Sequence, residues 1–343
     1  MATWGIHNEH PSLDLLGNSM ITIGWDAAGD LTPLGPDRAA IKHRVAKTYP
    51  DAKPGAIPIW AGVLLRFGFE MQPGDIVIWP NKQDSTLNFG RIEGGYQHYA
   101  SAPLQRNRRK VAWLKTGVPR AQFSQAALYE VGSAVTLFRV KSHEAEFLTF
   151  LGRGSPYPSP LVNDAEVSDE TATINAEDEP NAERIETHSR DFIVKALMSG
   201  IDGYKFEHFV AHVLRCMGYR TQVTQASGDG GFDILAHRDP LGLEPPIIKV
   251  QCKRTVGAIG QPDVQKLTGT LAPGGSELGL FVTLGGYTPE AKNFGRNRQD
   301  LRLVTGVELV DMIFEHYDQF DPEWKRLLPL RQVYVVDREP QSG

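Results

Sequence analysis

Three residues between positions 233 and 253 have the types and spacing to bind a metal ion beside a phosphodiester. Asp233 falls in the apolar segment 232–236, and Gln251 and Lys253 fall in or directly after the segment 247–252. Both segments have the length and β-branched content of buried strands, and the turn-forming sequence D-P-L-G between them predicts a hairpin. Because side chains alternate along a strand, those of Gln251 and Lys253 leave the same face. We therefore expect an acid, an amide and an ammonium group to converge at the sheet surface.

These groups match the ligand set of a hard divalent cation. Mg²⁺ prefers oxygen ligands, of which the protein often supplies only one or two carboxylates while water and phosphate supply the rest. The available oxygens are those of Asp233, the side-chain carbonyl of Gln251 and the backbone carbonyl of Cys252. Lys253 would polarise the attacking water and offset charge in the transition state of phosphodiester hydrolysis. The alternative is two buried strands with a lysine snorkelling at the strand end, and the preceding D-G-G-F-D weighs against it.

The order G-D-G-G-F-D…Q-C-K resembles the Mrr-type branch of the PD-(D/E)xK nuclease superfamily, in which Gln commonly stands at the second acidic position. The likeness runs over about residues 204–317. It includes F-E-H-F-V-A-H-V-L-R-C-M-G-Y before the motif and L-G-L-F-V-T-L-G-G-Y-T-P-E-A after it. The resemblance implies an α/β fold with a PD-(D/E)xK nuclease core, in which a mixed sheet is flanked by helices.

The same resemblance assigns roles to individual residues. It implies that Asp233 and Gln251 are the metal-site residues, that Lys253 is the catalytic lysine, and that Mg²⁺ is the cofactor, with Mn²⁺ as a substitute. The family pattern also places an acid on the first helix, which here is Glu207. Asp229 is a second acid within reach, although its turn context suits an Asx-type structural role at least as well. Whether Glu207 or Asp229 binds a second metal ion stays open.

A helix over residues 204–217 must position Glu207. Its apolar residues recur at the spacing of one helix face, namely at Phe206, Phe209, Val210, Val213, Leu214 and Met217. Glu207 lies at the edge of this stripe, where a salt-bridge partner and a metal ligand are equally expected. Further strands are predicted over 220–225, 278–284 and 301–305, and further helices over 191–199, 262–271 and 307–317 and from Thr288. The resulting order, α-β-β-β-α-β-α-β-α, is that of the superfamily core.

Basic residues recur in two regions that could contact DNA phosphates. In the C-terminal half they are Lys266 on one predicted helix and Lys292, Arg296 and Arg298 on another. In the N-terminal half they form the run Arg106-Asn107-Arg108-Arg109-Lys110. The alternatives are a solvated helix face for the first set and a solvated loop for the second.

Residues 1–151 predict a β-rich α+β domain, with many short apolar runs broken by Gly and Pro and a small barrel as one possible form. Helices are predicted over 38–49 and 58–66. The pattern G-D-I-V-I-W-P…F-G-R-I-E-G-G-Y-Q-H-Y…N-R-R-K-V-A-W resembles the PUA-like group that includes EVE domains. In that group a small barrel binds modified bases or nucleotides.

Five of the six tryptophans lie in this N-terminal region, together with Tyr96 and Tyr99. Most of these rings are expected to fill the core of a small β domain. Aromatic faces also stack on bases, and flipped bases are read in aromatic pockets. The candidates for such a pocket sit at or beside predicted strand ends, and they are Trp25, Trp79, Tyr96 and Trp113.

Length and composition indicate the number of domains and the cellular compartment. A chain of 343 residues favours two domains. We expect a recognition domain over 1–151, an acidic flexible linker over 152–188 and a nuclease domain over 189–343. The net charge of −5 excludes a globally basic nucleic-acid binder. Two cysteines without a disulfide pattern, no signal peptide and no apolar run of spanning length indicate a cytoplasmic protein without membrane contact.

Three functional hypotheses follow. The first is a Mg²⁺-dependent endonuclease for double-stranded DNA, a modification-dependent restriction enzyme that flips a modified cytosine into its N-terminal domain and works as a homodimer or higher homo-oligomer. The second is an anti-phage effector nuclease whose N-terminal domain senses a nucleotide signal or a partner. The third is a DNA-binding module whose nuclease-like fold is inactive, which the intact D…Q-x-K disfavours.

Overall fold

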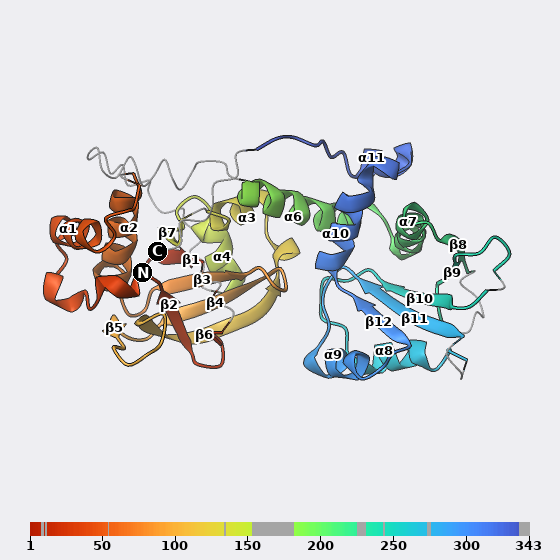
Figure 1. The fold of residues 1–343 in the computed structure, drawn as a ribbon, viewed down its shortest axis with the longest axis horizontal. Coiled ribbons are helices and arrows are strands. Elements are labelled where there is room, and N and C mark those ends of the chain that lie inside the picture. Colours follow the sequence, from red (N-terminus) through yellow and green to blue (C-terminus); the bar gives the residue numbers. More distant parts are fainter. Residues whose placement is uncertain are drawn as a thin grey trace. The chain divides into compact units, whose positions relative to one another are not determined.

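The computed structural model describes residues 1–7, 10, 12–53, 55–133, 135–152, 182–224, 231–242, 244–272 and 276–335. They form two compact units, Met1–His188 and Ser189–Val333, and Tyr334 and Val335 group with the first. Each unit has its own sheet (Figure 1). Most of the expected linker lies outside the described residues. Its last residues, 182–188, are helical and begin α6 (Ala182–Gly200), where a flexible segment was expected.

The helical start of α6 has a physical cause. The side chain of Arg184 is buried, and its guanidinium lies over the ring of Tyr129, 3.7 Å from the centroid. The same guanidinium donates hydrogen bonds to the Tyr129 carbonyl. These contacts anchor a segment that its acidic composition alone predicts to be disordered.

The first unit contains a seven-stranded sheet of order β2-β6-β4-β3-β1-β7, with β5 paired to β6. The strands are β1 (Thr3–Ile6), β2 (Met20–Ile23), β3 (Ile76–Asn81), β4 (Thr86–Ile92), β5 (Gln97–His98), β6 (Asn107–Pro119) and β7 (Leu137–Arg139). The helices are α1 (Arg38–Thr48), α2 (Ala56–Leu65), α3 (Gln125–Val131) and α4 (Glu144–Phe150). Shorter helical turns are η1 (Asp26–Ala28), η2 (Thr32–Leu34), η3 (Arg66–Glu70) and η4 (Arg120–Gln122).

This unit is β-rich α+β, as predicted, and both predicted helices are present. Within the described residues its sheet is not a closed barrel, because β2 and β7 stand at its two ends and do not pair with each other. The long strand β6 pairs with β2 through its first residues and with β4 through the rest. One face of the sheet packs on α1 and α2 in a core that includes Trp4, Trp25 and Trp60. The other face packs on α3 and α4 around Phe89 and Phe147.

The second unit contains a five-stranded mixed sheet of order β12-β11-β10-β9-β8. Its strands are β8 (Arg220–Val223), β9 (Ile234–His237), β10 (Ile247–Lys253), β11 (Glu277–Thr283) and β12 (Leu301–Val304). Its helices are the end of α6, then α7 (Gly203–Cys216), α8 (Gln261–Thr268), α9 (Pro289–Arg296), α10 (Gly306–His316) and α11 (Pro322–Leu327), with the turn η5 (Tyr317–Gln319). Strands β8 to β10 are antiparallel neighbours, and β10 to β12 are parallel.

The predicted order of elements is therefore confirmed, with α11 added at the end. Helices α6, α7, α10 and α11 pack over one face of the sheet, and α8 and α9, which connect the parallel strands, pack over the other (Figure 1). This is the predicted mixed sheet flanked by helices. It leaves the hairpin β9–β10 between α7 on one face and α8 on the other.

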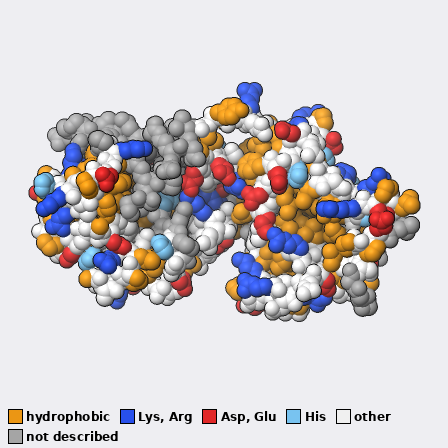
Figure 2. All heavy atoms as spheres, viewed as in Figure 1, with side chains coloured by type: hydrophobic (Ala, Val, Ile, Leu, Met, Phe, Trp, Pro, Cys, Tyr) orange, Lys and Arg blue, Asp and Glu red, His pale blue; other side chains and the backbone are white. Residues whose placement is uncertain are grey.

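One surface of this unit is unusually apolar. A hollow of about 430 Å³ lies between α7, α10 and strands β10–β12, and its lining includes Val213, Met217, Ile248, Leu280, Leu301 and Met312. Figure 2 shows hydrophobic side chains gathered over this face. No helix of the described residues is long and apolar enough to cross a membrane.

Candidate functional site

Strand pairing places Asp233 against the end of β10. Its N–H donates to the carbonyl of Val250 (2.7 Å), and its own carbonyl accepts from the N–H of Thr224 (2.8 Å), so the residue extends the ladder at the start of β9. Its carboxylate oxygen Oδ2 accepts from Nε2 of Gln251 (2.7 Å) and from the N–H of Cys252 (2.6 Å). The structure thus brings together the acid and the amide that the sequence predicted to converge.

Glu207 adds a second carboxylate from α7. The helix begins after Asp202, whose side chain accepts from the N–H of Lys205 (2.8 Å). Burial and, to a smaller extent, the charges of Asp233 and Asp202 together raise the pKa of Glu207 from 4.5 to about 7. Burial also raises the pKa of Asp233, against the opposing effect of the Cys252 N–H. Both carboxylates are therefore partly desolvated, and the charge of Asp233 acts on Glu207.

The donor set fits a hard divalent cation. Within the described residues no group of three or more His, Cys, Asp and Glu side chains could hold a metal ion. The available set is instead two carboxylates, the amide of Gln251 and the backbone carbonyl of Cys252, all oxygen donors of the kind that Mg²⁺ accepts. Burial is the main cause that raises the pKa of the Cys252 thiol well above its usual range, and the charges of Asp233 and Glu207 act in the same direction. The thiol is therefore neutral and supplies neither a thiolate ligand nor a nucleophile.

Lys253 does not contact this cluster in the structure, which differs from the predicted convergence. Its Nζ donates to Oδ2 of Asp263 at 2.7 Å. Asp263 lies in the first turn of α8, the helix that directly follows the loop after β10. The hydroxyl of Thr283 on β11 lies 3.1 Å from the carbonyls of Lys253 and Thr255 and holds the backbone here. The carboxylate of Asp263 is therefore the ion-pair partner of this lysine.

Asp263 is a site residue that the sequence analysis missed. It also lies 3.4 Å from Nζ of Lys266, one helical turn later. Its pKa is lowered, chiefly by the hydrogen bond from Lys253. The available signal was an acid in the first turn of the helix after Q-C-K, but helix starts are enriched in acids for reasons of dipole alone.

The basic residues predicted to contact phosphates on α8 and α9 differ in exposure and in their partners. Lys266 is exposed and shares Asp263 with Lys253. Arg296 and Lys292 are exposed on α9, whereas Arg298 forms a two-bond ion pair with Asp300.

The basic run near position 108 is not a loop, because Asn107 to Lys110 belong to β6. Arg109 is buried, and its guanidinium donates to the carbonyls of Phe67, Gly68 and Gly94. This placement removes Arg109 from the candidate phosphate contacts. Arg106 and Arg108 are half-buried and bond to nearby carbonyls through their guanidinium groups.

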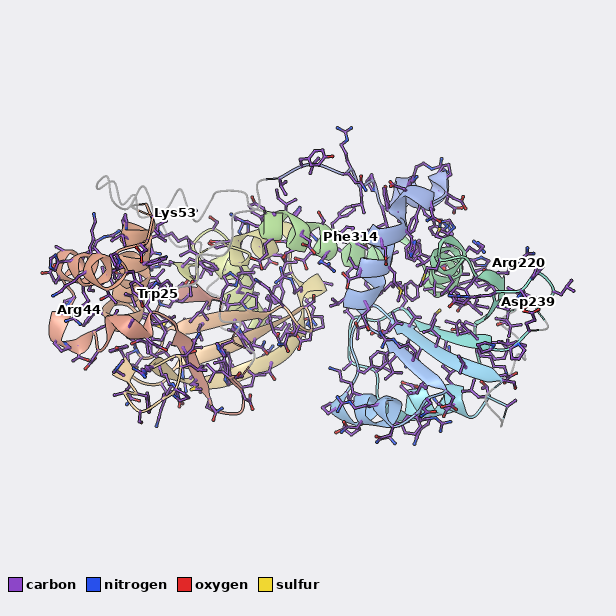
Figure 3. The ribbon with its side chains drawn as sticks, in the orientation of Figure 1. Trp25, Arg44, Lys53, Arg220, Asp239 and Phe314 are labelled. Carbon is purple, nitrogen blue, oxygen red and sulfur yellow. The ribbon has the colours of Figure 1, made fainter. Side chains whose placement is uncertain are left out.

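The four candidate pocket residues all pack against the same core cluster of the first unit. Trp25 is buried between the sheet and helices α1 and α2, 6.0 Å from the ring of Trp60 (Figure 3). Trp79 and Trp113 pair with each other at 6.0 Å. The hydroxyl of Tyr96 accepts from the N–H of Leu31 (3.2 Å) and donates to Oδ1 of Asn107 (2.7 Å).

Trp25 has two unusual features. Its backbone adopts a left-handed conformation, with φ at 60°, which is uncommon for a residue other than glycine. Its indole Nε1 is buried without a hydrogen-bond partner among the described residues, and such a donor calls for an explanation. Asn107, bonded to Tyr96, also donates to the carbonyl of Gly24 (2.9 Å), so Tyr96 is linked to the segment that carries Trp25. Asp229 lies outside the described residues.

The second unit is thus a mixed α/β domain that carries a carboxylate–amide cluster, and most of this unit matches a known family. Residues 198–313 match the Mrr_cat family, described as restriction endonuclease. Most of the C-terminal unit thus matches a restriction endonuclease family. Residues 4–141 match a family described only as a domain of unknown function. The likeness of the first unit to PUA and EVE domains accordingly stays a prediction.

One curated relative is the type IV methyl-directed restriction enzyme EcoKMrr of Escherichia coli (strain K12). It is 35% identical over 117 residues, which are 33% of this chain and 38% of that enzyme. Two solved structures were also found, MspJI restriction endonuclease in complex with a 27-mer oligonucleotide and the DNA modification-dependent restriction endonuclease AspBHI.

Each solved structure is 14% identical to this chain and is covered over 78% of its length. MspJI matches 97% of this chain with a TM-score of 0.33, and AspBHI matches 95% with a TM-score of 0.35. Both TM-scores lie below 0.5, so neither likeness bears on the fold or the function.

Glu207→Gln tests the electrostatic account of the site. Because the pKa of Glu207 is raised to about 7, the folded protein binds more protons than the unfolded chain between pH 4.5 and 7, and stability from this group is lost as pH rises through 7. We expect Glu207→Gln to raise the melting temperature of metal-free protein at pH 8 more than at pH 5. Glu315→Gln, an exposed change on α10, should give no such difference. Equal shifts at both pH values would contradict the account.

Proposed function

We propose that this chain is a Mg²⁺-dependent endonuclease for double-stranded DNA, in which the second unit hydrolyses phosphodiesters and the first selects a modified site. One observation supports the catalytic part above all. The carboxylate of Asp233 is held by Gln251 and the Cys252 N–H, beside Glu207, within a restriction endonuclease domain. This arrangement at the end of two paired strands supports an oxygen-donor site for the ion.

The residues divide the chemistry between them. Asp233, Gln251 through Oε1 and the Cys252 carbonyl would hold Mg²⁺, with Glu207 beside it. When bound, the ion supplies charge for the phosphate oxygens and lowers the pKa of a bound water. Lys253 leaves Asp263 when a phosphate arrives and donates a hydrogen bond to its non-bridging oxygen, where negative charge develops. Water then adds to phosphorus and releases a proton to solvent, one ester P–O bond breaks, and the leaving oxygen takes up a proton.

Selection of a modified cytosine is assigned to the first unit. Its support is the buried indole N–H of Trp25, which has no hydrogen-bond partner among the described residues, and the hydroxyl of Tyr96, which Asn107 links to the neighbouring Gly24. Aromatic groups of this type read an extruded base. Burial raises the pKa of Tyr96 to about 12, so this hydroxyl remains a donor at neutral pH. The name of the Escherichia coli relative, a methyl-directed enzyme, agrees with this role.

Cleavage of matched duplexes tests both parts. The substrates carry cytosine, 5-methylcytosine or 5-hydroxymethylcytosine at the same positions, and each is incubated with Mg²⁺ or with a chelator. We expect cleavage only with Mg²⁺ and at least about tenfold faster for one modified duplex, since a single good contact is worth about 1–3 kcal/mol. Trp25→Phe, which removes the indole N–H, should reduce that preference while leaving cleavage intact.

The outcomes separate the hypotheses. Equal cutting of all duplexes would refute base selection and favour an effector nuclease whose first unit senses another signal. Absence of cutting of any nucleic acid with Mg²⁺ or Mn²⁺ would refute the nuclease and leave a DNA-binding module.

We further propose that the protein works in the cytoplasm as a homodimer or higher homo-oligomer. One catalytic centre cuts one strand, so a double-strand break needs two centres. The apolar hollow on the second unit offers hydrophobic area to a second copy. Analytical ultracentrifugation with and without modified duplex measures this, and a monomer in both conditions would contradict it.

A further inference from the structure

The second unit also has a polar pocket, which lies beside the proposed catalytic centre. It is open, has a volume of about 430 Å³, and occurs where α6 ends and α7 begins. Its lining consists of the last residues of α6 (198–200), Ile201, Asp202, Lys205 and Arg254. All belong to the second unit. None of them is among the predicted ligands of the metal or the candidate phosphate contacts.

The two basic side chains of this pocket are only partly engaged. Arg254 donates from Nη1 to the carbonyl of Met198, while its Nε is buried without a hydrogen-bond partner among the described residues. Lys205 is exposed in the first turn of α7. Asp202 is the one acid of the lining, and it accepts from the backbone N–H of Lys205. The lining thus carries two positive charges against one negative charge.

The position of the pocket relates it to the chemistry. Arg254 follows Lys253 directly in the chain and, as the next residue after β10, leaves the strand on the opposite side. Lys205 precedes Glu207 by two residues on α7. Each of the two basic residues thus lies one or two positions along the chain from a residue proposed for the catalytic centre.

We propose that this pocket binds a backbone phosphate of the DNA strand next to the scissile phosphate, through Arg254 and Lys205. The inference rests on the proposed nuclease function. The guanidinium of Arg254 matches a phosphate better than a carboxylate of a protein partner, because phosphate offers several acceptor oxygens to a planar fork. The start of the 14-residue helix α7 adds backbone N–H groups and a positive dipole end on the same side.

The salt dependence of DNA binding tests the proposal. Full-length wild-type protein and the double variant Lys205→Gln/Arg254→Gln are titrated into a fluorescent modified duplex, in chelator to prevent cleavage, at a series of KCl concentrations. Removing one phosphate contact lowers the slope of log K against log[salt] by about 0.9. We expect a slope lower by about 0.9 and affinity about tenfold weaker at fixed salt. Lys195→Gln/Arg326→Gln, with the same charge change outside the pocket, should match the wild type.

Two further variants guard against a loss of structure. Lys205→Gln alone changes an exposed side chain, so it should keep the wild-type melting temperature and still lower the slope. Arg254→Lys keeps the positive charge and should restore much of the slope that Arg254→Gln removes. Slopes of the double variant and of Lys205→Gln equal to the control would overturn the proposal.

Cleavage assays keep this test distinct from that of the proposed function. With saturating duplex and Mg²⁺, Lys205→Gln should retain the single-turnover rate and raise only the DNA concentration needed for half-maximal cleavage. If wild-type protein cuts DNA and the slopes are unchanged, the pocket assignment is wrong and the nuclease stands. If the slopes fall but the wild type cuts nothing, the phosphate site stands and the nuclease proposal is wrong.

Discussion

Asp233→Asn is expected to reduce Mg²⁺-dependent cleavage by about a thousandfold or more while the protein stays folded. The substitution keeps the shape of the side chain, and the amide oxygen can still accept the N–H of Cys252 that now bonds Oδ2 (2.6 Å). It removes the negative charge that would hold the metal ion. Metal-ion stabilisation of the transition state is worth several kcal/mol, and every 1.36 kcal/mol is tenfold in rate.

Single-turnover cleavage of a modified duplex measures this loss, with circular dichroism as the check on folding. Asp311→Asn is the matched control, because Asp311 is an acid of the same unit that pairs with Arg190 on α6. The control should cut at the wild-type rate. Cleavage by Asp233→Asn within tenfold of the wild type would show that the carboxylate is not a metal ligand.

Lys253→Ala is expected to lower the cleavage rate by about 10²–10³ with little change in DNA affinity. A donor aimed at charge that develops only in the transition state contributes an effect of that size to the rate and not to binding. Lys253→Arg should recover part of the rate, since it keeps a charged donor. Single-turnover rates over a range of DNA concentrations separate the effect on the cleavage rate from the effect on DNA affinity.

Asp263→Asn is the companion variant, and it distinguishes catalysis from local structure. The Lys253–Asp263 pair is substantially exposed, with side-chain exposures of 47% and 33%. Such pairs contribute at most about 1 kcal/mol, or about fivefold. If Lys253 leaves Asp263 during each turnover, Asp263→Asn should stay within that factor of the wild-type rate. A loss as large as that of Lys253→Ala would mean that the pair acts as a unit.

The elements around the catalytic centre could be predicted from the sequence because local patterns specify them. The apolar stripe of α7 follows helical spacing, and the β-branched runs of β9 and β10 are bounded by turn residues. Strand alternation then placed Gln251 near Asp233, which the hydrogen bond at 2.7 Å confirms as a contact. Secondary structure alone was enough to predict this pair.

Long side chains and distant partners could not be predicted in this way. The ammonium of Lys253 sits several rotatable bonds from its backbone, so a nearby carboxylate on α8 decides where it points. The basic run suggests that Arg109 is exposed to solvent. In the structure it is buried, and it donates hydrogen bonds to the carbonyls of Phe67 and Gly68, some 40 residues earlier. The acidic start of α6 is helical because Arg184 finds Tyr129, 55 residues away.

Gln251 is uncharged, so only two carboxylates, those of Asp233 and Glu207, would face the ion. A glutamate at position 251 would have supplied a third. A site with less negative charge attracts a free divalent ion more weakly, and one of its two acids is half-protonated near neutral pH. The DNA phosphate would then complete both the charge and the coordination. Ion and substrate must in that case strengthen each other's binding by the same factor, so that the enzyme without bound DNA would hold the ion weakly.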